Sequence, residues 1–214
     1  LQHLLFASCT TIEALHLDIY EFRPKIQDIV FSYHFPHLIS LTVRERRWQC
    51  LIGQVFADFL SIHNTLTHLD LGERGRAFSF PREPANAVIL HPDTLPRLSS
   101  FRGSLKSLEA MTKARLRCLW TTVVKVEVSP SIIYREGRET NRAEAHETLS
   151  VLGGLLAFEA FQRVEEFRLY LGIYEEDMEP FVRAVRSLFL RGSVKARRGI
   201  DETIVEARIE SNLA

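Results

Sequence analysis

Cysteine is scarce in this sequence, with three residues in 214. Cys9, Cys50 and Cys118 lie far apart, and each has apolar residues within three positions. An odd number of scattered cysteines does not form a disulfide framework, and their spacing matches no zinc-binding motif. We therefore interpret them as reduced thiols of the core, which predicts a cytoplasmic or nuclear location.

The sequence also has no net charge and no long hydrophobic run. Its 27 basic residues balance 27 acidic ones, so the whole molecule has no field that would attract nucleic acid or an anionic membrane. No apolar stretch approaches the roughly 20 residues of a membrane span, and no signal peptide is recognisable. The chain begins with Leu inside an apolar pattern, and we expect it to be part of a longer protein.

Motifs of catalytic and metal sites are missing from the sequence. The stretch "GERGR" at 72–76 lacks the Lys-Ser/Thr pair of a phosphate-binding loop, and no Gly-x-Ser-x-Gly nucleophile elbow occurs. His34 and His37 are separated by Pro36, and no nearby cysteine or carboxylate completes a tetrahedral metal site. The sequence therefore predicts no enzyme, no metal and no cofactor.

What the sequence does contain is a recurring pattern of apolar residues. In "TLTHLDLGE", residues 65–73, Leu66, Leu69 and Leu71 form the pattern Leu-x-x-Leu-x-Leu with polar residues between them. Counting this one, such triplets begin at residues 12, 38, 66, 98, 123, 164 and 204, with spacings of 26, 28, 32, 25, 41 and 40. The triplet at 98 is incomplete because Gly103 takes its third place, and the one at 204 is weak. The series indicates a repeat architecture.

Helical patterns separate the apolar triplets. Apolar residues recur at spacings of three and four within residues 24–35, 50–63, 104–116, 144–161 and 175–192. In the second of these, the predicted buried side consists of Leu51, Val55, Phe59 and Ile62, widened by Ile52, Phe56 and Leu60. One strand-and-helix unit cannot bury its own apolar side, whereas stacked units cover one another. We predict an α/β fold, an irregular solenoid of the leucine-rich-repeat type, with parallel strands on the concave face and helices on the convex face.

Two segments interrupt this alternation. Residues 73–97 are rich in proline, and residues 129–145 are polar and charged. Segments of this length between regular elements are typical of long loops. We predict a loop at each and treat residues 1–214 as one degenerate repeat domain with wide helices.

Three stretches between about residues 30 and 105 resemble the leucine-rich-repeat region of fungal F-box-type proteins. They are Phe-Pro-x-Leu at 35–38, His-x-x-Leu-x-x-Leu-x-Leu at 63–71 and Leu-Pro-x-Leu-x-x-Phe-x-Gly at 95–103. The resemblance implies the substrate-recognition repeat domain of a receptor in a Skp–cullin–F-box ubiquitin ligase. It also implies a Skp-type adaptor as partner if an F-box lies upstream of Leu1.

Strand geometry predicts which side chains form a binding surface. Alternate residues of a strand point to opposite sides, so the residues between the buried apolar ones line the concave face. A face that mixes charged, histidine and tyrosine side chains suits a polar protein epitope. The predicted protein-binding residues are His16, Asp18, Thr42, Arg44, His68, Asp70, Arg102, Lys125, Glu127, Glu166, Arg168 and Tyr170.

Two alternatives stay open from the sequence. A free-standing repeat scaffold would need no link to ubiquitin. A nucleic-acid-associated protein could use two basic clusters, because arginine beside tryptophan can stack on bases, although the balanced overall charge argues against it. The clusters are Arg44, Arg46 and Arg47 beside Trp48, and Lys195, Arg197 and Arg198.

Overall fold

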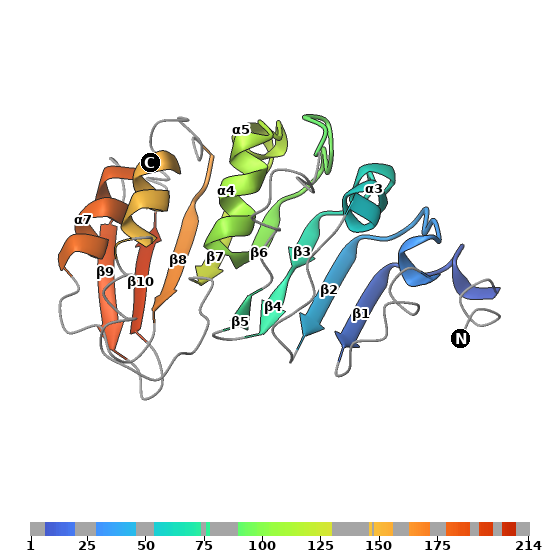
Figure 1. Cartoon of the computed structure of the whole chain (residues 1–214), viewed down its shortest axis with the longest axis horizontal. Helices are drawn as coiled ribbons and strands as arrows, with labels where there is room; N and C mark the ends of the chain where they lie inside the picture. Colours follow the sequence, from blue (N-terminus) through green and yellow to red (C-terminus); the bar gives the residue numbers. More distant parts are fainter. Residues whose placement is uncertain are drawn as a thin grey trace, which may run out of the picture.

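The main feature of the chain is an eight-stranded sheet with the order β1-β2-β3-β6-β7-β8-β10-β9 (Figure 1). The computed structural model describes residues 7–19, 29–45, 54–73, 76–77, 90–129, 146, 148–155, 163–171, 179–188, 193–198 and 203–208. The strands are β1 (Ala14–Ile19), β2 (Ser40–Glu45), β3 (His68–Asp70), β6 (Ser100–Ser104), β7 (Lys125–Ser129), β8 (Glu166–Leu171), β9 (Ser193–Arg198) and β10 (Thr203–Arg208). A separate antiparallel pair consists of β4 (Gly72–Glu73) and β5 (Arg76–Ala77).

The strands from β1 to β8 follow one another across the main sheet in chain order and run parallel. One backbone hydrogen bond recurs just before successive strands. In each case the backbone N–H before one strand donates to the carbonyl oxygen before the preceding strand of the sheet. The donor–acceptor pairs are Ile39–Glu13, Thr67–Ile39, Ser99–Thr67, Val124–Ser99 and Glu165–Val124. The sheet is open, since β1 and β9 end it on its two sides. The predicted α/β fold with mostly parallel strands is confirmed.

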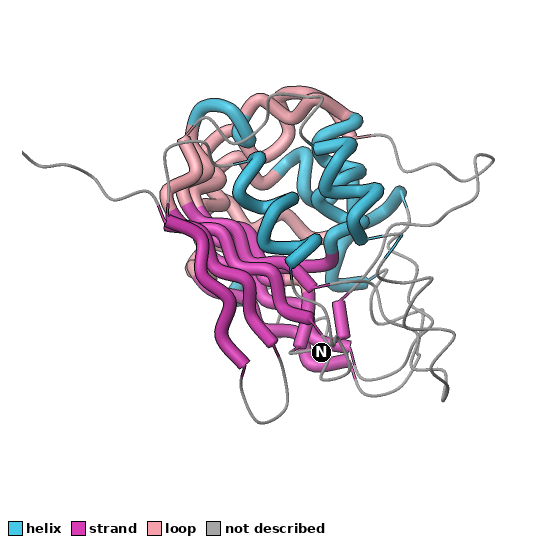
Figure 2. The backbone as a smooth tube through the Cα atoms, turned by 90° about the vertical axis from the view of Figure 1, so that its left-hand side faces the viewer, coloured by secondary structure: helices cyan, strands magenta, loops and turns pink. Residues whose placement is uncertain are grey.

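The described helices lie on one side of the sheet (Figure 2). They include residues 29–31, α3 (Gln54–Ile62), α4 (Leu105–Lys113), the single turn α5 (Cys118–Thr121), residues 148–155 and α7 (Glu179–Leu188). The Ser104 side chain caps α4 by accepting a hydrogen bond of 2.9 Å from the Ser107 backbone N–H. These helices lie where the apolar periodicity predicts them, except α5, which that pattern does not indicate.

The buried side of α3 agrees with the prediction at Phe56, Phe59 and Leu60 but not at Val55 and Ile62. Val55 and Ile62 are each 47% exposed, whereas Phe56, Phe59 and Leu60 are buried. The rings of Phe56 and Phe59 both pack on Phe31, with centroids 4.8 and 5.1 Å from its own. The aromatic residues take the core side of the helix because they bury more apolar area than Val55 and Ile62 would.

The repeated apolar residues form one core between the sheet and the helices. The residue that opens each of five triplets lies just before a strand and is completely buried; these residues are Leu38, Leu66, Leu98, Val123 and Val164. Burial is less complete toward β1, where Leu15 and Leu17 are only partly covered. The apolar pattern therefore predicts the core correctly for these repeats.

The prediction made from the triplet at residue 204 needs correction. β10 runs antiparallel to both of its neighbours, so the prediction of a further parallel repeat there is wrong. Val205 and Ala207 are buried, while Ile204 lies beside Tyr170 on the other side of the sheet. The sheet thus ends in an antiparallel pair, and its edge strand β9 carries basic residues, which discourage further strand pairing.

Of the two predicted loops, residues 74–75, 78–89 and 130–145 lie outside the described residues. The first loop is not wholly irregular, because β4 and β5 pair within it and residues 90–97 form turns. Cys118 is buried, and burial raises the pKa of its thiol to about 12, while Cys9 is partly covered. Cys50 lies outside the described residues. No helix in the described part of the chain has the length and hydrophobicity to cross a bilayer.

The gap that Gly103 leaves in the triplet at 98 is filled by Phe101. Both residues are buried in β6, and Phe101 is 0% exposed. A Cβ atom added at Gly103 would lie 2.7 Å from Cζ of the Phe101 ring, closer than packed carbon atoms allow. The Phe101 ring therefore occupies the space of the side chain expected at 103.

We expect Gly103→Ala to lower the free energy of unfolding by about 1–3 kcal/mol, because the methyl group overpacks the core against Phe101. Adding Phe101→Leu, which removes the obstructing ring atoms, should recover part of that loss. Urea unfolding of the two single variants and the double variant measures the coupling. Additive losses would show that the ring and the glycine are not matched.

His63 links the segments 35–38 and 63–71. The imidazole is 1% exposed; its Nε2 accepts a hydrogen bond of 2.9 Å from the Phe35 backbone N–H, so Nδ1–H donates to the Phe59 carbonyl oxygen at 2.6 Å. Both nitrogens are thus satisfied only in the neutral ring. Burial lowers the pKa of His63, and the nearby His34 lowers it further.

Because the folded-state pKa of His63 lies below its ordinary value of 6.5, the unfolded chain binds more protons near that pH. We expect the contribution of this group to the free energy of unfolding to be complete above pH 6.5. It should be lost as the pH falls below 6.5, with a slope of at most about 1.4 kcal/mol per pH unit. Urea unfolding between neutral and mildly acidic pH measures the slope, which His63→Gln should reduce and the exposed-site control His16→Gln should not. An unchanged slope in His63→Gln would contradict this account.

Candidate functional site

The side of the sheet away from the helices carries polar side chains in register, and we call it the polar face. Its central row consists of His16, Thr42, Asp70, Arg102, Glu127, Arg168, Glu206 and Lys195, each paired with the next across the strands. From Asp70 onward the sign of the charge alternates at every strand. A second row consists of Ala14, Ser40, His68, Ser100, Lys125, Glu166 and Arg208.

Most of the predicted binding residues take their expected places on this face. They alternate along the strands with the buried apolar positions, as in β8, where Phe167 and Leu169 are buried and Arg168 is half-buried. The Asp18 side chain lies outside the described part of the structure. Ion pairs and hydrogen bonds connect seven of the predicted residues in one set of contacts: Asp70, Arg102, Lys125, Glu127, Glu166, Arg168 and Tyr170. Among the described residues, His16, Thr42 and His68 form no ion pair.

Glu127 on β7 has the most partners among these residues, although it is 8% exposed. Its Oε1 lies 3.0 Å from Lys125 Nζ and 3.2 Å from Arg168 Nη1. Its Oε2 accepts a hydrogen bond of 3.3 Å from the Tyr170 hydroxyl and lies 3.8 Å from Arg102 Nε. Burial alone would raise the pKa of Glu127, but the cations outweigh it, and the pKa is lowered.

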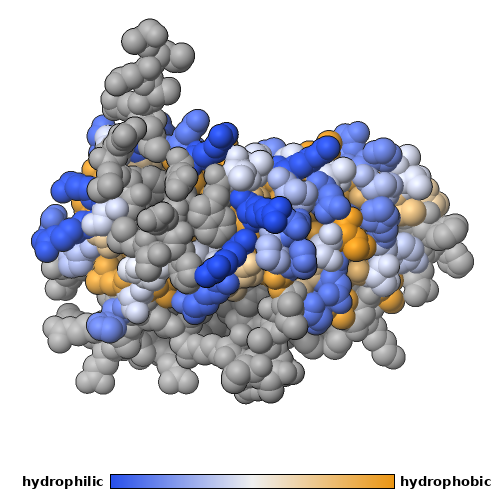
Figure 3. Space-filling model, turned by 90° about the horizontal axis from the view of Figure 1, so that it is seen from above, coloured by the Kyte–Doolittle hydropathy of each residue, from blue (hydrophilic) through white to orange (hydrophobic). Residues whose placement is uncertain are grey.

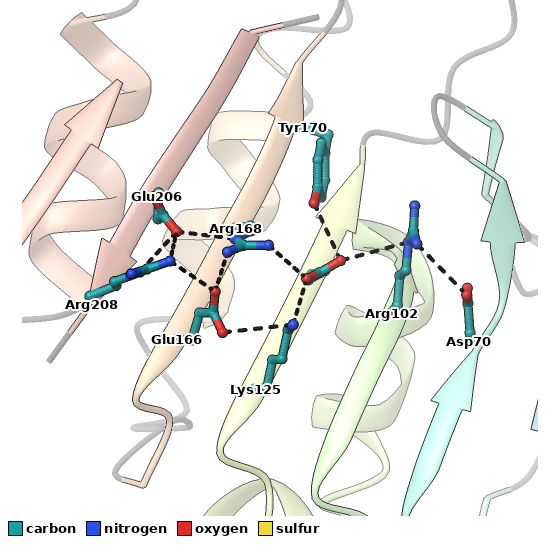
Figure 4. Close-up of polar contacts among 9 residues, drawn as sticks. Asp70, Arg102, Lys125, Glu166, Arg168, Tyr170, Glu206 and Arg208 are labelled. Atoms are coloured by element: carbon teal, nitrogen blue, oxygen red, sulfur yellow. Dashed lines mark hydrogen bonds and ion pairs between the residues drawn. The ribbon is translucent and has the colours of Figure 1, made fainter. Parts of the chain in front are cut away.

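Arg168 on β8 extends these contacts toward the end of the sheet (Figure 4). Its Nε donates to Glu206 Oε1 at 3.1 Å, and its Nη2 pairs with Glu166. Arg208 also donates to Glu206, at 3.0 Å. Glu206 is buried, which would raise its pKa, but Arg168 and Arg208 lower it. We call the whole set the charge network: Asp70, Arg102, Lys125, Glu127, Glu166, Arg168, Tyr170, Glu206 and Arg208.

Sequence reasoning missed Glu206, Arg208 and Lys195 as members of this face. Glu206 and Arg208 come from β10, where the triplet at 204 is weak and the predicted surface included no residue, and the basic cluster at 195–198 gives no strand signal. The one signal available was the alternation of Val205 and Ala207 with Glu206 and Arg208, which is typical of a half-buried strand.

Two atoms near Asp70 have no partner among the described residues. Oδ1 of Asp70 and Nε of Arg44 are both buried and make no hydrogen bond within that part of the chain. Burial raises the pKa of Asp70, although Arg102 and Arg44 favour its charged form. Unpaired buried polar atoms cost about 1–3 kcal/mol each, so this corner of the face can gain from a partner that supplies the missing contacts.

The two basic clusters are described only in part. Lys195 is exposed and stands on the polar face, whereas nothing is described of the Arg197 and Arg198 side chains or of residues 46–48. Large exposed hydrophobic residues in the described part are Val55 and Ile62 on α3, Ile39 before β2 and Val124 before β7. The surface seen from above is accordingly a mixture of hydrophilic and hydrophobic residues (Figure 3). The described residues contain no group of three or more His, Cys, Asp or Glu placed to hold a metal ion.

Comparison with known proteins adds no relative. No protein-family model, no curated protein and no solved structure matches this chain. Its function must therefore be argued from the polar face and from the motifs themselves.

Proposed function

We propose that this chain is a non-enzymatic protein-interaction module that holds a protein partner on its polar face. The observation that carries the proposal is the charge network, which spans β3, β6, β7, β8 and β10 on the side without described helices. Salt bridges and hydrogen bonds hold these side chains in place before a partner arrives. A pre-ordered polar surface loses less side-chain entropy on binding.

The chain is further proposed to be the substrate-recognition repeat domain of an F-box-like ubiquitin-ligase receptor, with an irregular leucine-rich-repeat solenoid as its fold. Parallel strands in chain order, with helices on one side, are consistent with a solenoid. Two motif residues of the resemblance have structural roles: His63 accepts a hydrogen bond from Phe35 of the preceding repeat, and the Phe101 ring fills the place beside Gly103 within its own repeat. A free-standing scaffold that binds its partner without ubiquitin is the alternative function.

The binding surface is tested by site-specific photo-crosslinking in cells of the source organism. A photoreactive amino acid at His68, exposed on the polar face, should crosslink to a defined partner. The same amino acid at Ser150, exposed in the helical segment 148–155, should not. Equal crosslinking to the same proteins from both positions would contradict a partner held on the polar face.

Co-purification of the natural full-length protein decides between the ligase receptor and the scaffold. For a receptor, a Skp-type adaptor should co-purify, and the crosslinked partner should have a longer half-life when the gene is deleted. A partner that binds through His68 without an adaptor and without a change in half-life would favour the scaffold.

A further inference from the structure

The charge network is layered by depth, with its cations outside its carboxylates. The Arg102, Lys125, Arg168 and Arg208 side chains are 27% to 59% exposed. The Asp70, Glu127, Glu166 and Glu206 side chains are 10% to 25% exposed. Basic side chains are longer and reach over the acidic ones, so a molecule approaching the face meets guanidinium and ammonium groups first.

Arg102 has more free donor capacity than the other arginines of the network. Its closest ion pairs, to Asp70 and Glu127, are both 3.8 Å long, and it donates no hydrogen bond within the described residues. Its guanidinium lies over the Tyr170 ring, 6.0 Å from the centroid, which fixes its direction. A guanidinium has five N–H donors, so Arg102 can bind a further carboxylate in the bidentate manner.

Lys195 provides a second cation that can bind a further carboxylate. Its side chain is exposed on the edge strand β9, beside Glu206, and no ion pair is formed by it among the described residues. Arg168 lies between Arg102 and Lys195 in the central row. The three cations therefore stand on every second strand, β6, β8 and β9, because β7 and β10 lie between them.

The spacing of these cations indicates the shape of the ligand. Neighbouring strands lie about 4.8 Å apart, so cations on every second strand are roughly 9–10 Å apart. A polyproline II helix rises about 3.1 Å per residue with three residues per turn, which places every third side chain on one side, about 9.3 Å apart. A β-strand repeats its side chains at roughly 7 Å and matches this spacing less well.

We propose that the polar face binds an acidic, extended segment of its partner that crosses the strands in the polyproline II conformation. Carboxylates at every third residue of that segment lie on Arg102, Arg168 and Lys195. This inference rests on the proposed protein-binding function and names the chemistry of the partner. Arg102 and Lys195 are the stronger anchors, since Arg168 already pairs with three carboxylates.

A nucleic acid fits the same face less well. Four carboxylates lie under the four cations of the charge network, so the net charge of the network is zero. A nucleic-acid backbone carries closely spaced phosphates and would meet both signs of charge along the central row. A peptide with spaced carboxylates can meet the cations and avoid Glu127 and Glu206.

Fluorescence anisotropy with labelled peptides tests the proposal at low ionic strength. The probe is the dodecapeptide (Glu-Pro-Pro)₄. Its controls are (Lys-Pro-Pro)₄ and a peptide of the same composition with its four glutamates consecutive between two tetraproline ends. The probe should bind about tenfold more tightly than the lysine peptide and measurably more tightly than the clustered one, with binding weakened by salt. Equal binding of the three peptides, or tighter binding of a single-stranded oligonucleotide of equal length, would overturn the proposal.

Charge reversal locates the bound peptide. Arg102→Glu and Lys195→Glu should each weaken binding about fivefold to tenfold, whereas Arg183→Glu on α7 should not. Lys195→Glu remains informative if Arg102→Glu does not fold, because Lys195 forms no ion pair among the described residues. Unchanged affinity in folded Lys195→Glu would overturn the assignment.

The failure of this inference can be told apart from a failure of the proposed function. If a cellular partner crosslinks through His68 while the glutamate peptide does not bind, the face binds protein of another chemistry and only the inference is wrong. If no partner crosslinks through His68, the proposed function itself is wrong.

Discussion

Glu127→Ala is expected to lower the free energy of unfolding by about 2–3 kcal/mol. The carboxylate is the common partner of Lys125, Arg168, Tyr170 and Arg102, and its removal leaves three cations close together. Removing one partner of a fully buried pair costs about 3–5 kcal/mol. We expect less because the cations are partly exposed and can be rehydrated.

The pH dependence of this effect has a definite sign. The folded-state pKa values of Glu127 and Glu206 are lowered, so the unfolded chain binds more protons near the ordinary value of 4.5. Their stabilising contribution is therefore present above pH 4.5 and is lost as the pH falls through the folded-state values. In Glu127→Ala the part of the acid-induced loss that comes from Glu127 should be missing.

Urea unfolding at neutral and acidic pH measures both effects. The matched control is Glu109→Ala, which removes a glutamate of the α4 surface whose one ion pair within the described part of the chain is the i,i+4 contact with Lys113. It should change the free energy of unfolding by less than about 0.5 kcal/mol. A loss in Glu127→Ala no larger than in the control would show that the charge network does not stabilise the sheet.

Exchanging Leu41 and Thr42 is expected to lower the free energy of unfolding by about 3–5 kcal/mol, although the composition of the chain is unchanged. Leu41 is completely buried beside Leu69, and Thr42 lies on the polar face beside Asp70. The double variant Leu41→Thr with Thr42→Leu moves a hydroxyl into the core and leaves a space where the leucine was. The expected loss follows from the phase of the strand, since successive side chains point to opposite sides.

The matched control exchanges Ser40 and Thr42, which both point to the polar face from β2. The variant Ser40→Thr with Thr42→Ser should lower the free energy of unfolding by less than about 0.5 kcal/mol. Thermal and urea unfolding of both variants provide the comparison. Similar losses in the two exchanges would contradict the assignment of an inner and an outer side to β2.

Much of the fold could be predicted from the sequence because one local rule operates in six successive strands. The Leu-x-x-Leu-x-Leu triplets mark both the buried residue before each strand and the phase of the strand itself, as Leu66, Leu69 and Leu71 illustrate. The residues of the polar face follow from that phase by alternation. The same rule failed at β10, because period-two alternation is common to parallel and antiparallel strands and does not give the direction of the chain.

The charge network could not be predicted as a set of contacts. Arg102, Glu127 and Arg168 come from strands that begin 25 and 41 residues apart, and their contact depends on the lateral register of those strands. The register is set by the lengths of the segments between them, which the apolar pattern does not specify. The depth of Glu127 likewise follows from the longer basic side chains around it.

Successive repeats lie side by side in this fold, so that their outward residues form continuous rows. Glu13, Ile39, Val124 and Glu165 precede β1, β2, β7 and β8, are exposed, and lie outside the charge network. Spin labels attached through a ketone-bearing amino acid at pairs of these positions allow their separations to be measured by double electron–electron resonance. With about 4.8 Å per strand, the separation should be about 19 Å for Glu13–Val124 and for Ile39–Glu165, and about 24 Å for Glu13–Glu165. A Glu13–Glu165 separation no longer than that of Glu13–Val124 would contradict the order of the strands and the polar face built on it.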